Sequence, residues 1–245
     1  MISVIGSRAK GLSGDKSDYD IRVIALYPVE LYMLQRAPPT RKIKTELDGV
    51  EVEGTCICLQ QALKWALETN PAIYDALYSQ TLFETDVIGK LKQLFELNYK
   101  PNKLRMALAG QIKAYTREKK MVQNKQTAEF KMATEALYLA LKLRWVCLFD
   151  NEIPPMDIGA LIERICQDDE TAKEWIFDIV ESRKADKNAM YTKTPEYVKF
   201  ISDSESFSEE FKTEKGKKEA KDKTEQMQRA ADELFLEAIG FKAVS

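Results

Sequence analysis

The sequence predicts an α+β fold, in which a small mixed β-sheet domain is followed by a mainly helical domain. Two observations support this prediction. Apolar and polar residues alternate in several short runs over the first 55 positions, as they do in half-buried strands. From Leu59 onward, apolar residues recur at helical spacing over most of the remaining chain.

The strands are expected first along the chain. Runs rich in Val, Ile and Thr that are bounded by Gly, Pro or Asp are typical of strands. Asp48-Gly49 is a hairpin signal between the last two of these runs. The predicted strands are residues 3–5, 19–26, 41–46 and 50–53, with a short helix at 29–35.

The helical part follows, and Asn70-Pro71 marks the end of its first helix. Helices are expected over residues 59–67, 73–77, 87–97, 103–120, 128–149, 158–166 and 173–180. Three domains are predicted along the chain. These are a mixed sheet domain of residues 1–85, a helical domain of residues 86–200 and a charged C-terminal helical arm of residues 201–245.

The arm is rich in both acidic and basic residues, and it becomes amphipathic from Met227 to Ile239. Such charge runs are usually solvated faces of a helix, here with a terminal turn that docks on the protein. The alternative is an interaction arm for a protein partner. The slightly acidic local balance disfavours RNA as the partner of the arm.

The amino-acid composition excludes several kinds of catalytic and metal site. The chain has no histidine, which excludes Ser-His-Asp and Cys-His catalysis and zinc bound by His. Its four cysteines form no CxxC pair. No apolar run approaches the roughly 20 residues that cross a bilayer, so a cytoplasmic protein without a membrane partner is expected. Carboxylates, lysines, hydroxyls and hard metal ions remain for catalysis.

Two short motifs carry the candidate chemistry. A strand runs into the loop Gly6-Ser7-Arg8-Ala9-Lys10-Gly11, and the next strand opens with Ser17-Asp18-Tyr19-Asp20. Residues i and i+2 of a strand share a face, so Asp18 and Asp20 are expected to converge on one site. Two neighbouring carboxylates repel each other unless a cation lies between them, and Mg²⁺ prefers such hard oxygen ligands.

The loop supplies the other half of the predicted site. Its backbone N–H groups and the Ser7 hydroxyl can cradle a polyphosphate, and Arg8 and Lys10 add positive charge. Glu51 and Glu53 share one face of a further strand, so either could be a third carboxylate. A lone Asp-x-Asp is often only a turn or strand cap, but the upstream Gly-Ser and these acids favour two-metal nucleotidyl transfer.

GSRAKG followed by SDYDIR resembles the signature of the DNA polymerase β-like nucleotidyltransferase superfamily. Within it, the sequence is most similar to the predicted RNA repair pathway polymerase-β family. Tyr27-Pro28, the helix from Leu59 and Asn70-Pro71 are further features of that likeness. It covers about residues 1–80 well and residues 100–165 loosely.

The resemblance implies roles for particular residues. It makes Asp18, Asp20 and Glu51 the catalytic carboxylates and ligands of Mg²⁺, or of Mn²⁺ as the alternative, with Glu53 as the rival for the third position. It implies that the nucleotide is held by Gly6, Ser7, Arg8, Ser17 and Lys131. The sequence departs from the family pattern at Glu51, where Asp is usual, at residues 55–61, and at Tyr138, where Arg is usual.

The implied activity is that of a nucleotidyltransferase. It would transfer a nucleoside monophosphate from an NTP such as ATP to a hydroxyl and release pyrophosphate. An RNA or tRNA end, in repair or modification, is the favoured acceptor on the family likeness. The alternatives are the same chemistry on a protein side chain or small molecule, and a catalytically silent protein that binds a nucleotide and a partner.

Overall fold

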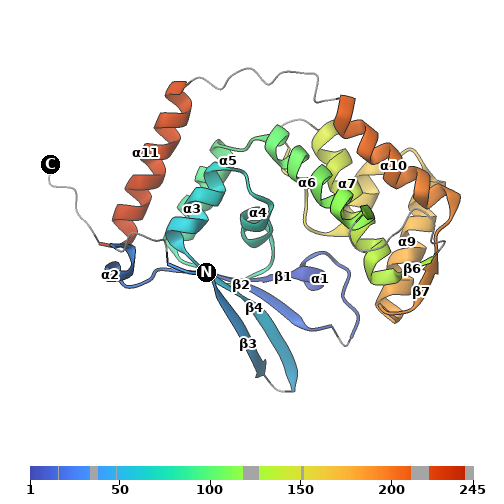
Figure 1. Ribbon diagram of the computed structural model, residues 1–245, viewed down its shortest axis with the longest axis horizontal. Coiled ribbons are helices and arrows are strands. Elements are labelled where there is room, and N and C mark those ends of the chain that lie inside the picture. The colour runs from blue at the N-terminus through green and yellow to red at the C-terminus, as the bar shows by residue number, and fades with distance from the viewer. Residues whose placement is uncertain are drawn as a thin grey trace. The chain divides into compact units, whose positions relative to one another are not determined.

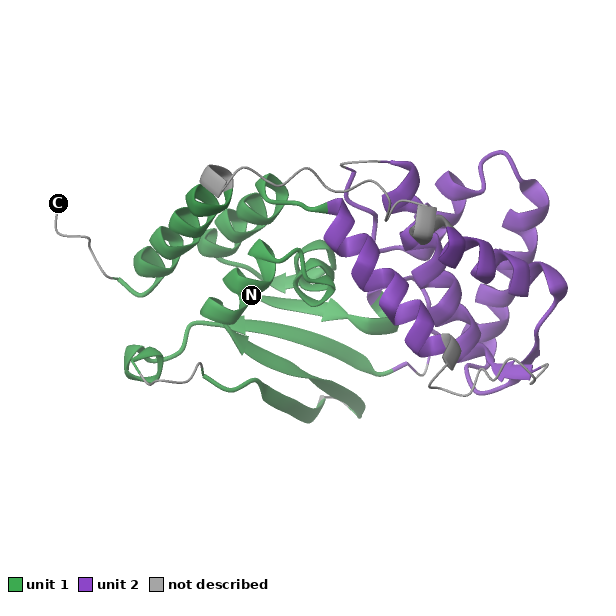
Figure 2. Ribbon diagram, turned by 45° about the horizontal axis from the view of Figure 1, so that its top comes forward, with its two compact units in different colours: residues 1–8, 18–100, 216–245 green, residues 9–17, 101–215 purple. Residues whose placement is uncertain are grey.

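The computed structural model describes residues 1–15, 17–33, 38–47, 49–117, 127–149, 152–210 and 221–240. The chain forms two compact units (Figure 2). The first comprises Met1–Arg8, Asp18–Lys100 and Gly216–Ser245, and the second comprises Ala9–Ser17 and Pro101–Lys215. The three domains predicted from the sequence are a different division of the chain, and they stay a prediction.

A five-stranded mixed sheet forms the centre of the first unit and bears out the α+β prediction (Figure 1). Its order is β3-β4-β2-β1-β5, with β2 and β4 parallel and the other neighbours antiparallel. The strands are β1 (Ile2–Ile5), β2 (Tyr19–Ala25), β3 (Arg41–Leu47), β4 (Val50–Cys58) and β5 (Thr81–Phe83).

The register of the sheet aligns the polar residues of three strands. Asp20 on β2 pairs with Ile5 on β1 and with Glu53 on β4, and Glu53 pairs in turn with Lys44 on β3. Partners in neighbouring strands point to the same face. Asp20, Glu53 and Lys44 therefore form one row across the sheet.

Helices cover one side of this sheet, where α3, α4, α5 and α11 gather (Figures 1 and 2). Asn70 caps α4 by accepting a hydrogen bond from the Ala72 N–H at 2.8 Å, and Pro71 begins the helix. The Asn-Pro pair thus separates two consecutive helices. The helices are α1 (Gly6–Ala9), α2 (Val29–Tyr32), α3 (Leu59–Leu67), α4 (Pro71–Tyr78), α5 (Asp86–Leu97) and α11 (Lys221–Ala238).

Helix α11 brings the C-terminal part of the chain back to the first unit, where it contacts α3 and α5. Ala231 and Leu234 are buried, and the Phe235 ring meets the Tyr32 ring edge to face at 5.0 Å. The amphipathic pattern from Met227 onward predicted such docking. Its apolar stripe is used within the unit.

The second unit is helical, and α7 is its central helix. Leu137, Leu141 and Leu143 of α7 are fully buried, because neighbouring helices cover it on several sides. Two three-residue strands pair beside it. The elements are α6 (Pro101–Arg117), α7 (Phe130–Leu148), α8 (Ile158–Ile165), α9 (Glu170–Ala185), α10 (Pro195–Glu210), β6 (Thr127–Glu129) and β7 (Met190–Thr192).

The loop that follows α1 belongs to this second unit. The Ile158 N–H donates to the Lys10 carbonyl at 2.9 Å, and a Cβ on Gly11 would overlap the Asp157 carboxylate. Gly11 has a φ of +69°, a conformation that favours glycine. Gly11 therefore serves a close approach of the loop to Asp157, the residue that caps the start of α8.

Within the described ranges, none of the helices is long and apolar enough to cross a membrane.

Candidate active site

Gly6 brings the start of α1 against the first acidic strand. Its φ is +69°, and a Cβ built on it would overlap the Oδ2 atom of Asp20. Only glycine gives both this backbone conformation and this close approach. The carboxylate of Asp20 thus lies directly at the Gly-Ser turn, as a site for both a phosphate and a cation requires.

Arg8 holds the other end of the short helix to the same strand. Its Nε donates to the Asp18 carbonyl at 3.3 Å, and its guanidinium lies 3.9 Å from the centre of the Tyr19 ring. Asp18 is exposed and precedes β2, whereas Asp20 lies within β2 and is partly buried. The two motifs of the signature are therefore joined by contacts at both ends of α1.

The third carboxylate has two candidates on β4. Glu53 is the register partner of Asp20, and Glu51 lies two positions earlier on the same face. Both are exposed, and both form ion pairs with Lys44, that of Glu53 at 2.7 Å from Nζ to Oε1. The register favours Glu53 as the neighbour of Asp20.

These ion pairs change the protonation equilibria of the exposed groups. The hydrogen bond from Lys44, with its positive charge, lowers the pKa of Glu53 below its usual value. Hydrogen bonds to Glu51 and Glu53, with their negative charges, raise the pKa of Lys44. Glu53 and Lys44 are consequently both charged at neutral pH.

The donors fit a hard divalent cation in chemical type, since all are carboxylate oxygens. In the part of the chain that the structure describes, no three Asp, Glu or Cys side chains are gathered closely enough to hold one ion. Mg²⁺ commonly uses only one or two protein carboxylates, together with waters and substrate phosphates. The prediction that Asp18 and Asp20 hold such an ion stays a prediction, and Glu53 is the register partner of Asp20.

A comparison with known protein families matches residues 2–237 to the RNA repair pathway DNA polymerase beta family. The chain belongs to this family. The likeness indicated by the sequence motifs is thus confirmed and extends over nearly the whole chain. Membership makes the protein a polymerase-β-like nucleotidyltransferase by family and connects it with RNA repair. A search of curated proteins found no match.

Two of the predicted nucleotide contacts of this family member lie in the second unit. Ser17 closes a turn, because its Oγ accepts from the Gly14 N–H and its own N–H donates to the Gly14 carbonyl, both at 3.0 Å. Lys131 stands exposed in the first turn of α7. Their roles toward a nucleotide stay predictions.

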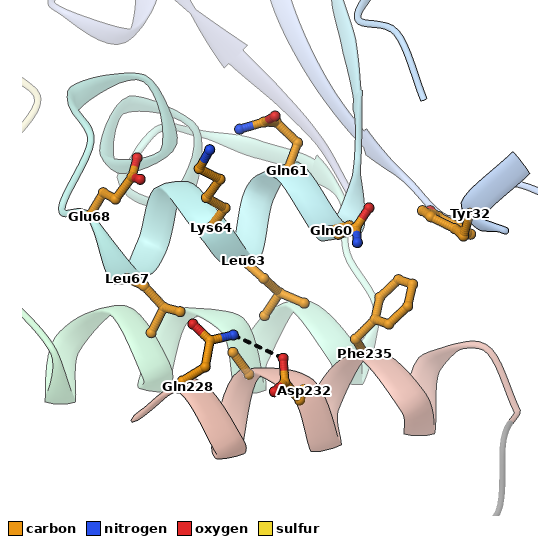
Figure 3. Close-up of a pocket in the computed structure, with 11 residues that line it drawn as sticks. Tyr32, Gln60, Gln61, Leu63, Lys64, Leu67, Glu68, Gln228, Asp232 and Phe235 are labelled. Carbon is orange, nitrogen blue, oxygen red and sulfur yellow. Dashed lines mark hydrogen bonds between the residues drawn. The ribbon is translucent and has the colours of Figure 1, made fainter. Parts of the chain in front are cut away.

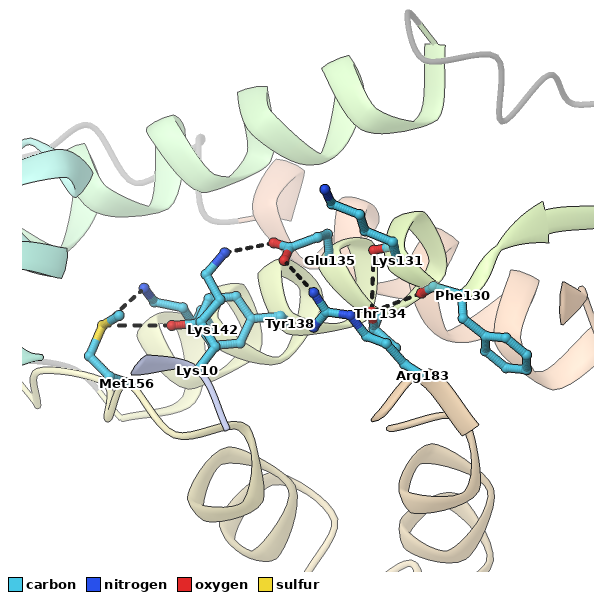
Figure 4. A network of polar contacts seen from close by, with 9 residues as sticks. All are labelled: Lys10, Phe130, Lys131, Thr134, Glu135, Tyr138, Lys142, Met156 and Arg183. Atoms are coloured by element: carbon cyan, nitrogen blue, oxygen red, sulfur yellow. Dashed lines mark hydrogen bonds and ion pairs between the residues drawn. The ribbon is translucent and has the colours of Figure 1, made fainter. Parts of the chain in front are cut away.

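Lys10 has a partner that the sequence did not indicate. Its Nζ lies 2.6 Å from Glu135 Oε2 on α7, and the other oxygen of Glu135 lies 3.5 Å from Arg183 on α9 (Figure 4). The positive charge of Lys10, predicted to serve the phosphate loop, is thus already paired. No local pattern predicts such a contact, since Glu135 is distant in the sequence.

A hollow of about 620 Å³ lies elsewhere in the first unit, between α3 and α11 (Figure 3). Leu63 and Leu67 point from α3 toward α11, and Tyr32 and Phe235 stand at one end. None of the predicted site residues lines it.

Proposed function

We propose that this family member transfers a nucleoside monophosphate from an NTP to a hydroxyl acceptor, with an RNA end as the favoured acceptor. The observation that carries the proposal is the close approach of Gly6 to Asp20, because it brings the turn proposed to bind phosphate against the strand proposed to bind a cation. The RNA acceptor rests on the family to which the chain belongs.

The reaction is an in-line displacement. The acceptor oxygen forms a bond to the α-phosphorus, the bond between that phosphorus and the α–β bridging oxygen breaks, and pyrophosphate leaves with the electron pair. A bound Mg²⁺ would neutralise charge on the phosphates and lower the pKa of the acceptor hydroxyl. Asp18 and Asp20 are the residues that would hold it, with an oxygen of Glu53 or Glu51 as the third carboxylate ligand.

The remaining residues of the first unit orient the reactants and take up the proton. The Ser7 hydroxyl and the backbone of the Gly6 turn hydrogen-bond the β- and γ-phosphates in this proposal. An oxygen of Glu53 or Glu51 accepts the hydroxyl proton in this proposal, since the chain has no histidine for this task and these carboxylates lie on the strand beside Asp20. Glu53 is favoured because of its register with Asp20.

The test is incubation with each α-labelled NTP, Mg²⁺ and a mixed RNA pool. Label should enter RNA with the intact protein and fall by at least about 100-fold in Asp20→Asn, which keeps the shape but loses the charge. Lys42→Gln, which alters a charge in the neighbouring row of the sheet, is the matched control and should retain activity.

Other outcomes decide between acceptors. Label that enters a protein instead of RNA, with the same dependence on Asp20, would replace RNA by a side chain as acceptor. No transfer by the intact protein to RNA, protein or small molecules, at any NTP, would overturn the proposal.

A further inference from the structure

Lys44 occupies a particular place beside the candidate metal site. It lies on the edge strand β3, in register with Glu53, which is itself in register with Asp20. Its ammonium also binds Glu51, so both candidates for the third carboxylate share one lysine. The row across the sheet thus consists of two acidic residues, Asp20 and Glu53, followed by the basic residue Lys44.

The ammonium competes for the same atoms that a metal ion needs. Glu53 Oε1 accepts a hydrogen bond from Lys44 Nζ at 2.7 Å. A hard cation binds carboxylate oxygens directly, so that oxygen cannot serve both partners fully at once. Glu53 is the register partner of Asp20, Glu51 lies two positions earlier on β4, and both carboxylates are engaged by Lys44 rather than gathered with Asp20.

We propose that Lys44 is a positioning residue that acts as an internal competitor of the divalent cation for Glu53 and Glu51. The third carboxylate is held by the lysine in the metal-free protein and exchanges to the cation on binding. This inference rests on the proposed function, because it takes Asp20 and its neighbours as the metal site. Beyond that function, Lys44 would set the cation concentration at which the site is half occupied.

The solvent exposure of the Lys44 ion pairs limits their effect on cation affinity. The side chain of Lys44 is 69% exposed, and those of Glu51 and Glu53 are about half exposed. Exposed ion pairs are weak and are screened by salt. Lys44 therefore tunes the affinity rather than blocks the site, and its removal should tighten cation binding about two- to fivefold at low salt.

The experiment is a titration of the full-length protein with Mn²⁺, followed by electron paramagnetic resonance of the free ion. Lys44→Gln should lower the Kd for Mn²⁺ about two- to fivefold, and Lys44→Arg should leave it near the wild-type value. Lys42→Gln removes an equal charge from the same face of β3, where Lys42 is in register with Thr55. Its effect should be clearly smaller.

Double variants show whether the competition runs through the glutamates. In a Glu51→Gln/Glu53→Gln background, Lys44→Gln should no longer change the Kd. A circular dichroism melt of each variant checks that it is folded. A Kd for Lys44→Gln that is equal to or weaker than that of the wild type would overturn the proposal, as would an equal gain in Lys42→Gln.

Failure of this inference differs from failure of the proposed function. If Mn²⁺ binding depends on Asp20 but is unchanged by Lys44→Gln, only the competition is refuted. If neither the wild type nor Lys44→Gln binds Mn²⁺ in a manner lost in Asp20→Asn, the metal site itself is refuted, and both proposals fall.

Discussion

Gly6 is the residue on which the geometry of the candidate site depends most directly. Its backbone lies in the left-handed region, and its missing side chain leaves room for the Asp20 carboxylate. The two requirements can be separated by experiment, because Gly49 has a similar φ of +77° and nothing within 4 Å of a built Cβ.

Gly6→Ala should lower the free energy of unfolding by about 1–2 kcal/mol, because an L-residue is strained at this φ. It should also lower nucleotidyl transfer to background, because the new methyl group displaces Asp20. Urea unfolding and the labelled-NTP assay measure the two effects.

Gly49→Ala is the matched control. It should lose a similar free energy of unfolding through strain alone and keep its activity. Equal activity in the two variants would show that the approach of Gly6 to Asp20 is not needed for transfer.

At the scale of elements, one carboxylate ties three segments of the second unit together. Glu135 on α7 binds Lys10 in the loop and Arg183 on α9. Arg183 is only 3% exposed, and two of its nitrogens are buried without a hydrogen-bond partner. Burial lowers the pKa of Arg183, but it stays charged, so the Glu135 carboxylate is needed to compensate it.

Glu135→Gln should therefore destabilise the protein by about 3 kcal/mol, since it leaves a buried guanidinium without a counter-charge. The expected result is a lower midpoint in urea with the slope unchanged. Glu181→Gln removes a carboxylate of an exposed pair with Lys184 and should change stability by less than about 0.5 kcal/mol. Similar losses in the two variants would contradict this account of Glu135.

The sequence predicted the long elements well and the short ones poorly. Alternation and helical spacing located β1 to β4 and most of the helices, because burial of one face imposes a period. Residues 6–11 were predicted as a loop, whereas Gly6–Ala9 forms α1, and α10 begins at Pro195, before the predicted start of the arm at residue 201. The three-residue strands β5, β6 and β7 were not predicted, since three residues are too few to show an alternating period. Strand β4 also runs on to Cys58, well beyond the alternating residues 50–53.

For the site, spacing within a strand predicted more than contacts between strands. The spacing of two predicts that Asp18 and Asp20 share a face, but β2 begins at Tyr19, so Asp18 lies just before the strand and the shared face stays a prediction. The pairing of Asp20 with Glu53 depends on the register between β2 and β4, which a single sequence does not specify. The ion pairs of Lys44 with the glutamates and of Lys10 with Glu135 depend on tertiary structure in the same way.

At the scale of the whole molecule, the two ends of the chain belong to one unit. Residues from Gly216 onward are grouped with the N-terminal sheet, and the buried Leu234 of α11 provides part of that packing. Docking uses the apolar stripe of the helix and leaves its charged face outward. A protein partner of the C-terminal arm, which stays a prediction, would meet that charged face.

Leu234→Ala should lower the free energy of unfolding by about 2–4 kcal/mol, because it removes a buried side chain from α11, the helix that contacts α3 and α5. Leu97, at the end of α5, is 67% exposed, so Leu97→Ala should change the free energy of unfolding by less than about 0.5 kcal/mol. An undocked α11 would be indicated if Leu234→Ala were equally neutral in thermal and urea unfolding.

The path of the chain through the two units also bears on its biosynthesis. The chain leaves the first unit after Arg8 and returns at Asp18, and the loop between is held in the second unit by the Glu135 carboxylate and the Ile158 N–H. At about 5–20 residues per second, a ribosome reaches Ile158, the later of these two anchors, roughly 7–27 s after the signature has been translated. The partners of the loop are therefore synthesised well after the signature itself. A chain that ends before them contains the motif but lacks the contacts that fix its loop.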